Sequence, residues 1–180
     1  MMSERSYSAK RVAIYGVLVA LAIVFGYVEH LIPLPIGIYG IKLGLSNIVT
    51  VVTLYLLGSI PALCLNVLRV LLSSLLFGNA FSLAYSLCGG IVSVIVMIIT
   101  QKLPSIGITG VSIAGGVTHN LAQLAVAVLL FDELRLAFYL PVLLAAGAIT
   151  GFLIGVVALP IINSKNIKDL FKKTKTKKGI

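Results

Sequence analysis

The stretch from Phe138 to Ile162, FYLPVLLAAGAITGFLIGVVALPII, decides the fold of this chain because its 25 residues include no charged side chain. An apolar run of about 18 residues or more is long enough to cross the hydrocarbon core of a bilayer as an α-helix. The stretch therefore predicts a transmembrane helix and an integral membrane protein.

Five further apolar segments precede this one, and each is bounded by polar residues, glycine or proline. Towards the N-terminus they are 108–131, 80–100, 60–77, 43–57 and 12–32. The segment 43–57 is short for a span, so we expect it to be little tilted or partly re-entrant. The sequence predicts an all-α, polytopic membrane protein with a bundle of six transmembrane helices.

The composition favours one membrane domain without a soluble catalytic domain. Hydrophobic residues make up 59% and charged residues 11% of the 180 residues, and the mean hydropathy is +1.14. A soluble domain has about 25% charged residues. We predict a cytoplasmic N-terminal segment over 1–11, a transmembrane domain over 12–162 and a basic cytoplasmic tail over 163–180.

The formal net charge of +9 comes largely from the two ends of the chain. Seven of the fourteen basic residues lie between Lys165 and Lys178, and Arg5, Lys10 and Arg11 precede the first apolar segment. Basic residues that flank spans usually lie on the cytoplasmic side and touch anionic lipid headgroups. We expect a plasma-membrane protein with both termini in the cytoplasm and a solvated, lipid-facing tail, in preference to a nucleic-acid arm.

Several polar side chains interrupt the apolar segments, where burial in hydrocarbon is costly. Arg69 lies near the middle of segment 60–77, and Asn66 shares its face because it is three residues away. His119 and Gln123 lie one helical turn apart in segment 108–131. These residues occupy the middle and outer half of the bundle, which predicts a cavity open to the outside. The predicted substrate-binding residues are Glu29, Lys42, Asn47, Asn66, Arg69, His119, Asn120 and Gln123.

Arg69 has no carboxylate at its own depth in the membrane, because Glu29 lies nearer the outer surface. A structural arginine and a ligand-binding arginine are equally compatible with this pattern. His119 alone fits a bond to a neighbouring helix better than a site. The four residues Arg69, His119, Asn120 and Gln123 together favour a site, in which Arg69 binds an acid or phosphate group of a small ligand.

No cofactor, metal site or catalytic residue is predicted. Cys64 and Cys88 lie inside apolar runs without CxxC spacing, so we interpret them as packing residues. The chain has no P-loop motif and no DDxxD-type acidic cluster to hold magnesium diphosphate. His30 and His119 are disfavoured as axial haem ligands because their depths differ.

Small residues recur at a spacing of three or four on the first segment, at Ala9, Ala13, Gly16 and Ala20. Such steps let another helix approach closely. Packing within the bundle is the favoured interpretation, and docking of a separate subunit is the alternative.

Five motifs lie along the chain, namely GIKLGLSNIV over 40–49, RVLL over 69–72, YSLCGG over 85–90, GVTHNLAQ over 116–123 and YLPV over 139–142. They resemble the motifs of the Gx transporter family, whose members are also labelled heptaprenyl diphosphate synthase component I. This family is similar to the S components of energy-coupling-factor transporters. The resemblance implies an S-component-like bundle that holds a small molecule and docks on a transmembrane coupling subunit with ATPases, through the small residues of the first segment.

Two other functions stay open. One is an accessory role in polyprenyl or menaquinone metabolism, or in flavin-based extracellular electron transfer. The other is an enzyme subunit of heptaprenyl diphosphate synthesis, which the absence of acidic magnesium-binding motifs disfavours.

Overall fold

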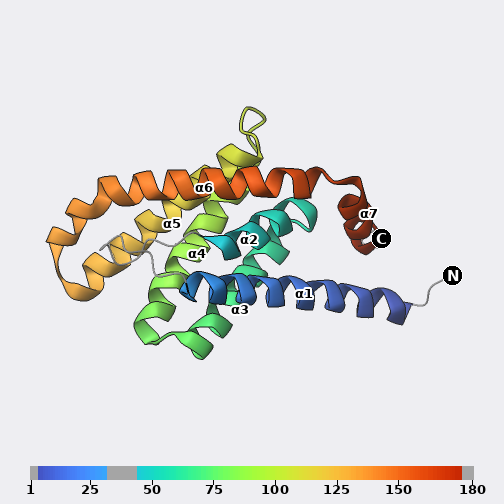
Figure 1. Ribbon diagram of the computed structural model, residues 1–180, viewed down its shortest axis with the longest axis horizontal. Coiled ribbons are helices and arrows are strands. Elements are labelled where there is room, and N and C mark those ends of the chain that lie inside the picture. The colour runs from blue at the N-terminus through green and yellow to red at the C-terminus, as the bar shows by residue number, and fades with distance from the viewer. Residues whose placement is uncertain (1–3, 32–43, 176–180) are drawn as a thin grey trace.

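The computed structural model describes residues 4–31 and 44–175, and the structural statements below refer to these residues. The described secondary structure is helical, which confirms the all-α prediction. Its elements, in chain order, are α1 (Glu4–Leu31), α2 (Leu45–Leu56), α3 (Ser59–Phe77), α4 (Ala80–Thr100), α5 (Ile108–Phe131), the 3-10 helix η1 (Leu134–Tyr139), α6 (Leu140–Asn163) and α7 (Lys165–Lys175) (Figure 1).

Five stretches are long and apolar enough to cross a membrane, which agrees with a multi-pass protein. They are Val12–Glu29 in α1, the helices α3, α4 and α5, and Leu134–Asn163, which joins η1 and α6. The sixth predicted span is α2, which has only 12 residues. At 1.5 Å per residue α2 is about 18 Å long, well short of a hydrocarbon core of about 30 Å. Six full spans are therefore not established.

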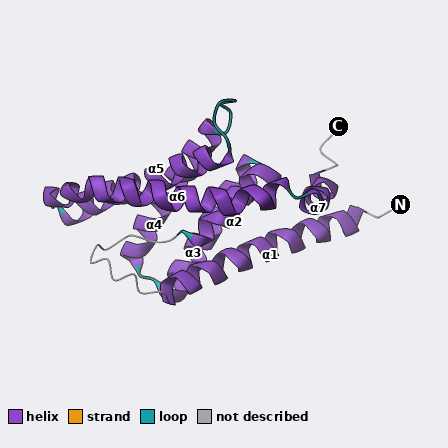
Figure 2. Cartoon of the chain, turned by 45° about the horizontal axis from the view of Figure 1, so that its top comes forward, coloured by secondary structure: helices purple, strands orange, loops and turns teal. Residues whose placement is uncertain are grey.

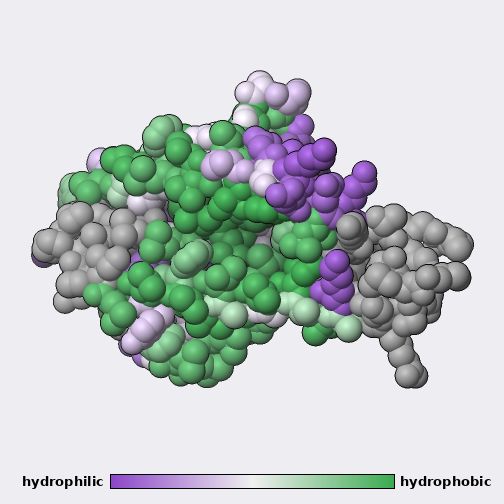
Figure 3. Space-filling view, turned by 45° about the vertical axis from the view of Figure 1, so that its right-hand side comes forward, coloured by the Kyte–Doolittle hydropathy of each residue, from purple (hydrophilic) through white to green (hydrophobic). Residues whose placement is uncertain are grey.

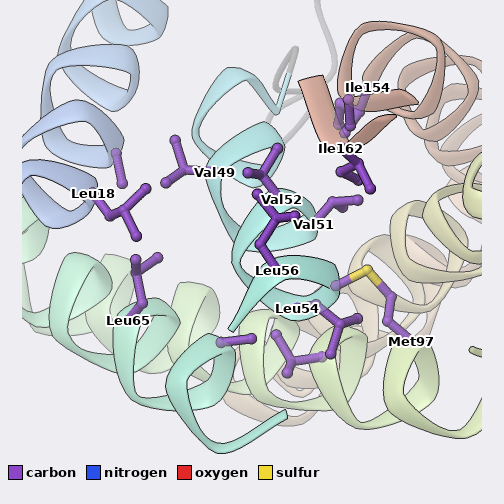
Figure 4. Close-up of a cluster of buried hydrophobic side chains, with 14 of the residues drawn as sticks. Leu18, Val49, Val51, Val52, Leu54, Leu56, Leu65, Met97, Ile154 and Ile162 are labelled. Carbon is purple, nitrogen blue, oxygen red and sulfur yellow. The ribbon is translucent and has the colours of Figure 1, made fainter. Parts of the chain in front are cut away.

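Helix α2 forms the centre of the molecule. It lies between α1 and α6 and also packs on α3. Figure 4 shows its Val49, Val51 and Leu54 among apolar side chains of the surrounding helices. The helix carries Val, Thr and Leu on every side and no charged residue, a pattern typical of a helix that is buried all round.

Helices α5 and α6 approach each other closely because glycines recur every four residues on α6. A Cβ atom at Gly151 would lie 2.6 Å from the carbonyl oxygen of Ser112, and one at Gly155 would lie 2.6 Å from the Cα of Thr109. No side chain fits at these distances, so the two backbones pack directly, as in other small-residue helix pairs in membranes.

Part of the tail that the sequence predicts to be solvated forms a docked helix. Residues 165–175 form helix α7, which contacts α1, α2 and α6. Phe171 is only 7% exposed and belongs to the apolar core, and Ile167 packs against that core from one turn earlier. Because Ile167, Leu170 and Phe171 share one helical face, the tail is amphipathic and docks instead of remaining wholly in solvent.

The first turns of α1 and helix α7 lie at the same end of the molecule (Figures 1 and 2). Figure 3 shows a surface dominated by hydrophobic residues, with hydrophilic residues gathered toward one end. Large apolar side chains such as Leu75 and Leu129, each 80% exposed, form this surface. Lipid contact accounts for such exposure. The cytoplasmic placement of the termini stays a prediction.

Candidate functional site

Arg69 is held in one orientation by four hydrogen bonds to neutral oxygen atoms. Its Nη1 donates to Ser46 Oγ at 2.7 Å, and Nη2 donates to Asn47 Oδ1 at 2.7 Å. Asn66 Oδ1 accepts from Nε at 3.2 Å and from Nη2 at 2.9 Å. A guanidinium has five N–H groups, so these bonds leave one N–H on Nη1. The charge is thus oriented, but none of these partners carries a negative charge.

Asn66 supports Arg69 from one turn earlier on α3 and is itself 1% exposed. Because its Oδ1 accepts both Arg69 bonds, its Nδ2 must point the other way, towards α4. A Cβ atom at Gly90 would lie 2.5 Å from that Nδ2, so the glycine provides the space that the amide occupies. Within the described chain, Asn66 Nδ2 has no hydrogen-bond partner.

Glu29 lies near the end of α1 and accepts a hydrogen bond from the backbone N–H of Gly44. Gly44 precedes α2 with a φ of 73°, a left-handed conformation that favours glycine. The turn brings Ser46 and Asn47, in the first turn of α2, to Arg69. Glu29 therefore lies at the positive end of the α2 dipole, and its charge also stabilises that of Arg69.

The polar residues of α5 divide into two kinds. Asn120 Nδ2 donates to the backbone carbonyl of Leu143 at 2.8 Å and so ties α5 to α6. His119 and Gln123 instead face α4 at Gly89, where a Cβ atom would lie 2.6 Å from Gln123 Cγ and 3.2 Å from His119 Cε1. The neighbouring glycines of α4 thus let α3 and α5 both bring polar side chains into the interior.

Two adjoining cavities meet at Arg69. The first has a volume of about 60 Å³ and is lined by residues of α1, α2, α3, α4, α5 and α6, among them Ser93, Gln123 and Thr150. The second, of about 250 Å³, lies among α1, α3 and α4 and has Ser46 of α2 in its wall. Both cavities are lined by Glu29, Ser46, Arg69, Val70 and Ser86. Arg69 therefore lies between the two spaces.

The second cavity is rich in serine hydroxyls that sequence reasoning did not single out as site residues. They belong to Ser46, Ser73, Ser74, Ser82 and Ser86. Thr100, Thr118 and Thr150 each donate to a carbonyl of their own helix, as Thr118 does to Ala114. The hydroxyls of α3 and α4 in this cavity make no such bond among the described residues. Their spacing in the sequence could have identified them, since Ser73 lies four residues after Arg69 and Ser82 lies four residues before Ser86.

The structure brings most of the predicted binding residues together. Those that line the first cavity are Glu29, Asn47, Arg69, His119, Asn120 and Gln123. Asn66 contacts Arg69 but lines neither cavity, and Lys42 lies outside the described residues. Within the described part of the chain, no group of three or more His, Cys, Asp or Glu side chains could hold a metal ion.

The predicted docking residues lie on the exterior. Ala9, Ala13, Gly16 and Ala20 are all exposed on α1, and a Cβ atom at Gly16 would have no described neighbour within 4 Å. Their role in docking a separate subunit stays a prediction.

Comparison with known proteins identifies one family. A family model described as heptaprenyl diphosphate synthase component I matches residues 18–160, well over half of the chain. This range contains Glu29, Arg69 and Gln123. A search of curated proteins and a search of solved structures found no match.

Proposed function

The chain belongs to the heptaprenyl diphosphate synthase component I family, and we propose that it is a substrate-binding membrane component of a transporter, which holds a small anionic ligand. The observation that carries this proposal is the setting of Arg69. Its guanidinium is oriented by neutral partners at the junction of two cavities.

A buried charge is costly unless an opposite charge or good hydrogen bonds compensate it. The four hydrogen bonds that Arg69 donates to Ser46, Asn47 and Asn66 supply part of that compensation. Glu29 adds an electrostatic contribution, but it also bonds to the N-terminus of α2. An anion in the second cavity would accept the remaining N–H of Arg69 and be surrounded by serine hydroxyls, which completes the compensation.

The short helix α2 supports the same proposal. Its first turn lines the first cavity through Ser46 and Asn47, so the positive end of its dipole points at the site. Helix N-termini in protein interiors are favourable for anions, and discontinuous helices of transporters use them in this way. The length of α2 therefore fits a binding role better than a simple span.

We propose that the ligand enters from the outer side and that the chain depends on partners for energy. The sequence has no nucleotide-binding P-loop. The exposed small residues Ala9, Ala13, Gly16 and Ala20 would form the surface that docks on a transmembrane coupling subunit with ATPases. This arrangement corresponds to an energy-coupling-factor S component.

We further propose that the chain binds its ligand without catalysing a reaction. Prenyl chain elongation uses clustered acidic residues to hold magnesium, and Glu29 is the only acidic residue among those that line either described cavity. A single carboxylate that already accepts a hydrogen bond from Gly44 fits a residue that shapes a binding site, not a cluster that holds magnesium.

Native mass spectrometry of protein extracted in mild detergent tests the proposal. Wild-type protein should carry an additional small-molecule mass, and Arg69→Gln should lose it while remaining folded. Arg135→Gln is the matched control, because Arg135 is exposed and pairs with Glu133 away from the cavities. Retention of the mass by Arg69→Gln at the wild-type level would refute the role of Arg69.

The family description supports a second candidate, an accessory membrane protein of polyprenyl metabolism. Pull-down experiments distinguish the two. Recovery of a coupling subunit with paired ATPases favours the transporter. Stimulation of prenyl transfer when the protein is mixed with a soluble synthase favours the accessory role.

A further inference from the structure

Gln123 presents a buried amide that no described residue satisfies. The side chain is 2% exposed and lines the first cavity. Its Nε2 atom has no hydrogen-bond partner among the described residues. Buried amides in proteins are almost always paired, so this one requires a specific explanation.

Asn120 shows that an amide of the same helix can find a hydrogen-bond partner within the protein. Asn120 lies on the same helix, three residues earlier, and its amide is bonded to Leu143. Gln123 instead lies against Gly89, where the missing side chain leaves just enough room for its Cγ atom. The local packing therefore holds an unpaired amide in place beside the cavity.

Arg69 lines this cavity and the second one, so a molecule that extends from the second cavity into the first can meet a cation and an uncharged amide at once. We infer that Gln123 determines specificity, by donating from Nε2 to an uncharged acceptor of the ligand such as a carbonyl oxygen or a ring nitrogen. The inference rests on the proposed function and adds to it. The ligand class is then an anion that also carries a neutral hydrogen-bond acceptor, and simple anions are rejected because they leave the amide unpaired.

The alternative is a structural amide that is satisfied by water, since a cavity of about 60 Å³ has room for ordered water. The two roles predict opposite changes in the stability of ligand-free protein. A binding amide that waits for its ligand destabilises the empty protein, whereas a water-bonded structural amide stabilises it.

The experiment compares Gln123→Met with Asn120→Leu in detergent, after washing until native mass spectrometry shows no bound mass. Methionine keeps the length of glutamine and removes both polar atoms. We expect Gln123→Met to raise the melting temperature by roughly 3 °C and Asn120→Leu to lower it by a similar amount. Before washing, Gln123→Met should carry at most about one tenth of the wild-type mass signal.

A Gln123→Met protein that melts below wild type overturns the inference, whatever Arg69→Gln does, because the amide is then structural. Identification of the bound mass as an anion without a neutral acceptor atom also overturns it and leaves the proposed function intact. Retention of the mass by Arg69→Gln overturns the proposed function instead, so the two failures are distinguishable.

Discussion

Asn66 and Arg69 lie one turn apart on α3, and a single oxygen of Asn66 accepts hydrogen bonds from both Nε and Nη2 of Arg69. This contact orients the guanidinium without neutralising it. The neutrality of the asparagine is therefore as important as its geometry, which leads to the first prediction.

Asn66→Asp should leave the protein folded and reduce ligand retention by about ten-fold or more. The carboxylate keeps the shape of the amide and pairs with Arg69, so the cation no longer attracts an anion. Melting temperature and native mass spectrometry measure the two effects, with the exposed Asn163→Asp as the control. Unchanged retention would show that Arg69 does not act through its net charge.

Gly90→Ala should lower the free energy of unfolding by about 1–3 kcal/mol, because the added Cβ would lie 2.5 Å from Asn66 Nδ2. The displaced Asn66 should also release Arg69 and weaken retention of the bound mass. Gly107→Ala is the control, since a Cβ atom there meets nothing within 4 Å. Equal melting temperatures of the two variants would contradict the close approach of α3 and α4.

Gly151→Leu should separate α5 from α6 and destabilise the protein more than Gly16→Leu does. The Cβ atom at Gly151 would lie 2.6 Å from the Ser112 carbonyl oxygen, whereas Gly16 faces open space. Overpacking of this kind costs about 1–3 kcal/mol or more. Thermal unfolding in detergent measures the difference, and similar stabilities would contradict the direct backbone packing.

Gly16→Trp should abolish co-purification with a coupling subunit while ligand retention stays at the wild-type level. The bulky side chain blocks close helix approach on the exposed face of α1 without touching the cavities. Leu75→Trp, at another exposed position, controls for the added bulk. Normal co-purification of Gly16→Trp would rule out this surface as the docking site.

Phe171→Ala should destabilise the protein by about 3–5 kcal/mol, because the Phe171 side chain of α7 is buried in the apolar core. Lys168→Ala should change little, since that side chain is exposed. Proteolysis of the tail offers a second readout, and release of α7 should make it faster. Equal protease resistance of Phe171→Ala and wild type would indicate that α7 does not depend on this contact.

The sequence by itself determined the class of protein and its long apolar helices. Runs such as 138–162 contain no charge over a length that spans a bilayer, and this property does not depend on any other part of the chain. The pairing of Asn66 with Arg69 was also accessible, because residues three apart share a helix face.

Only the tertiary structure decided which faces meet. The bonds from Arg69 to Ser46 and Asn47 join residues more than twenty positions apart. They form because the turn at Gly44 and the central position of α2 bring these residues to Arg69. On α5, Asn120 and Gln123 are equally polar in sequence, yet the Asn120 amide bonds to Leu143 and the Gln123 Nε2 atom has no partner among the described residues. Periodicity determines which side chains share a face, whereas the partner across the interface depends on how closely glycines such as Gly89 and Gly151 let the helices approach.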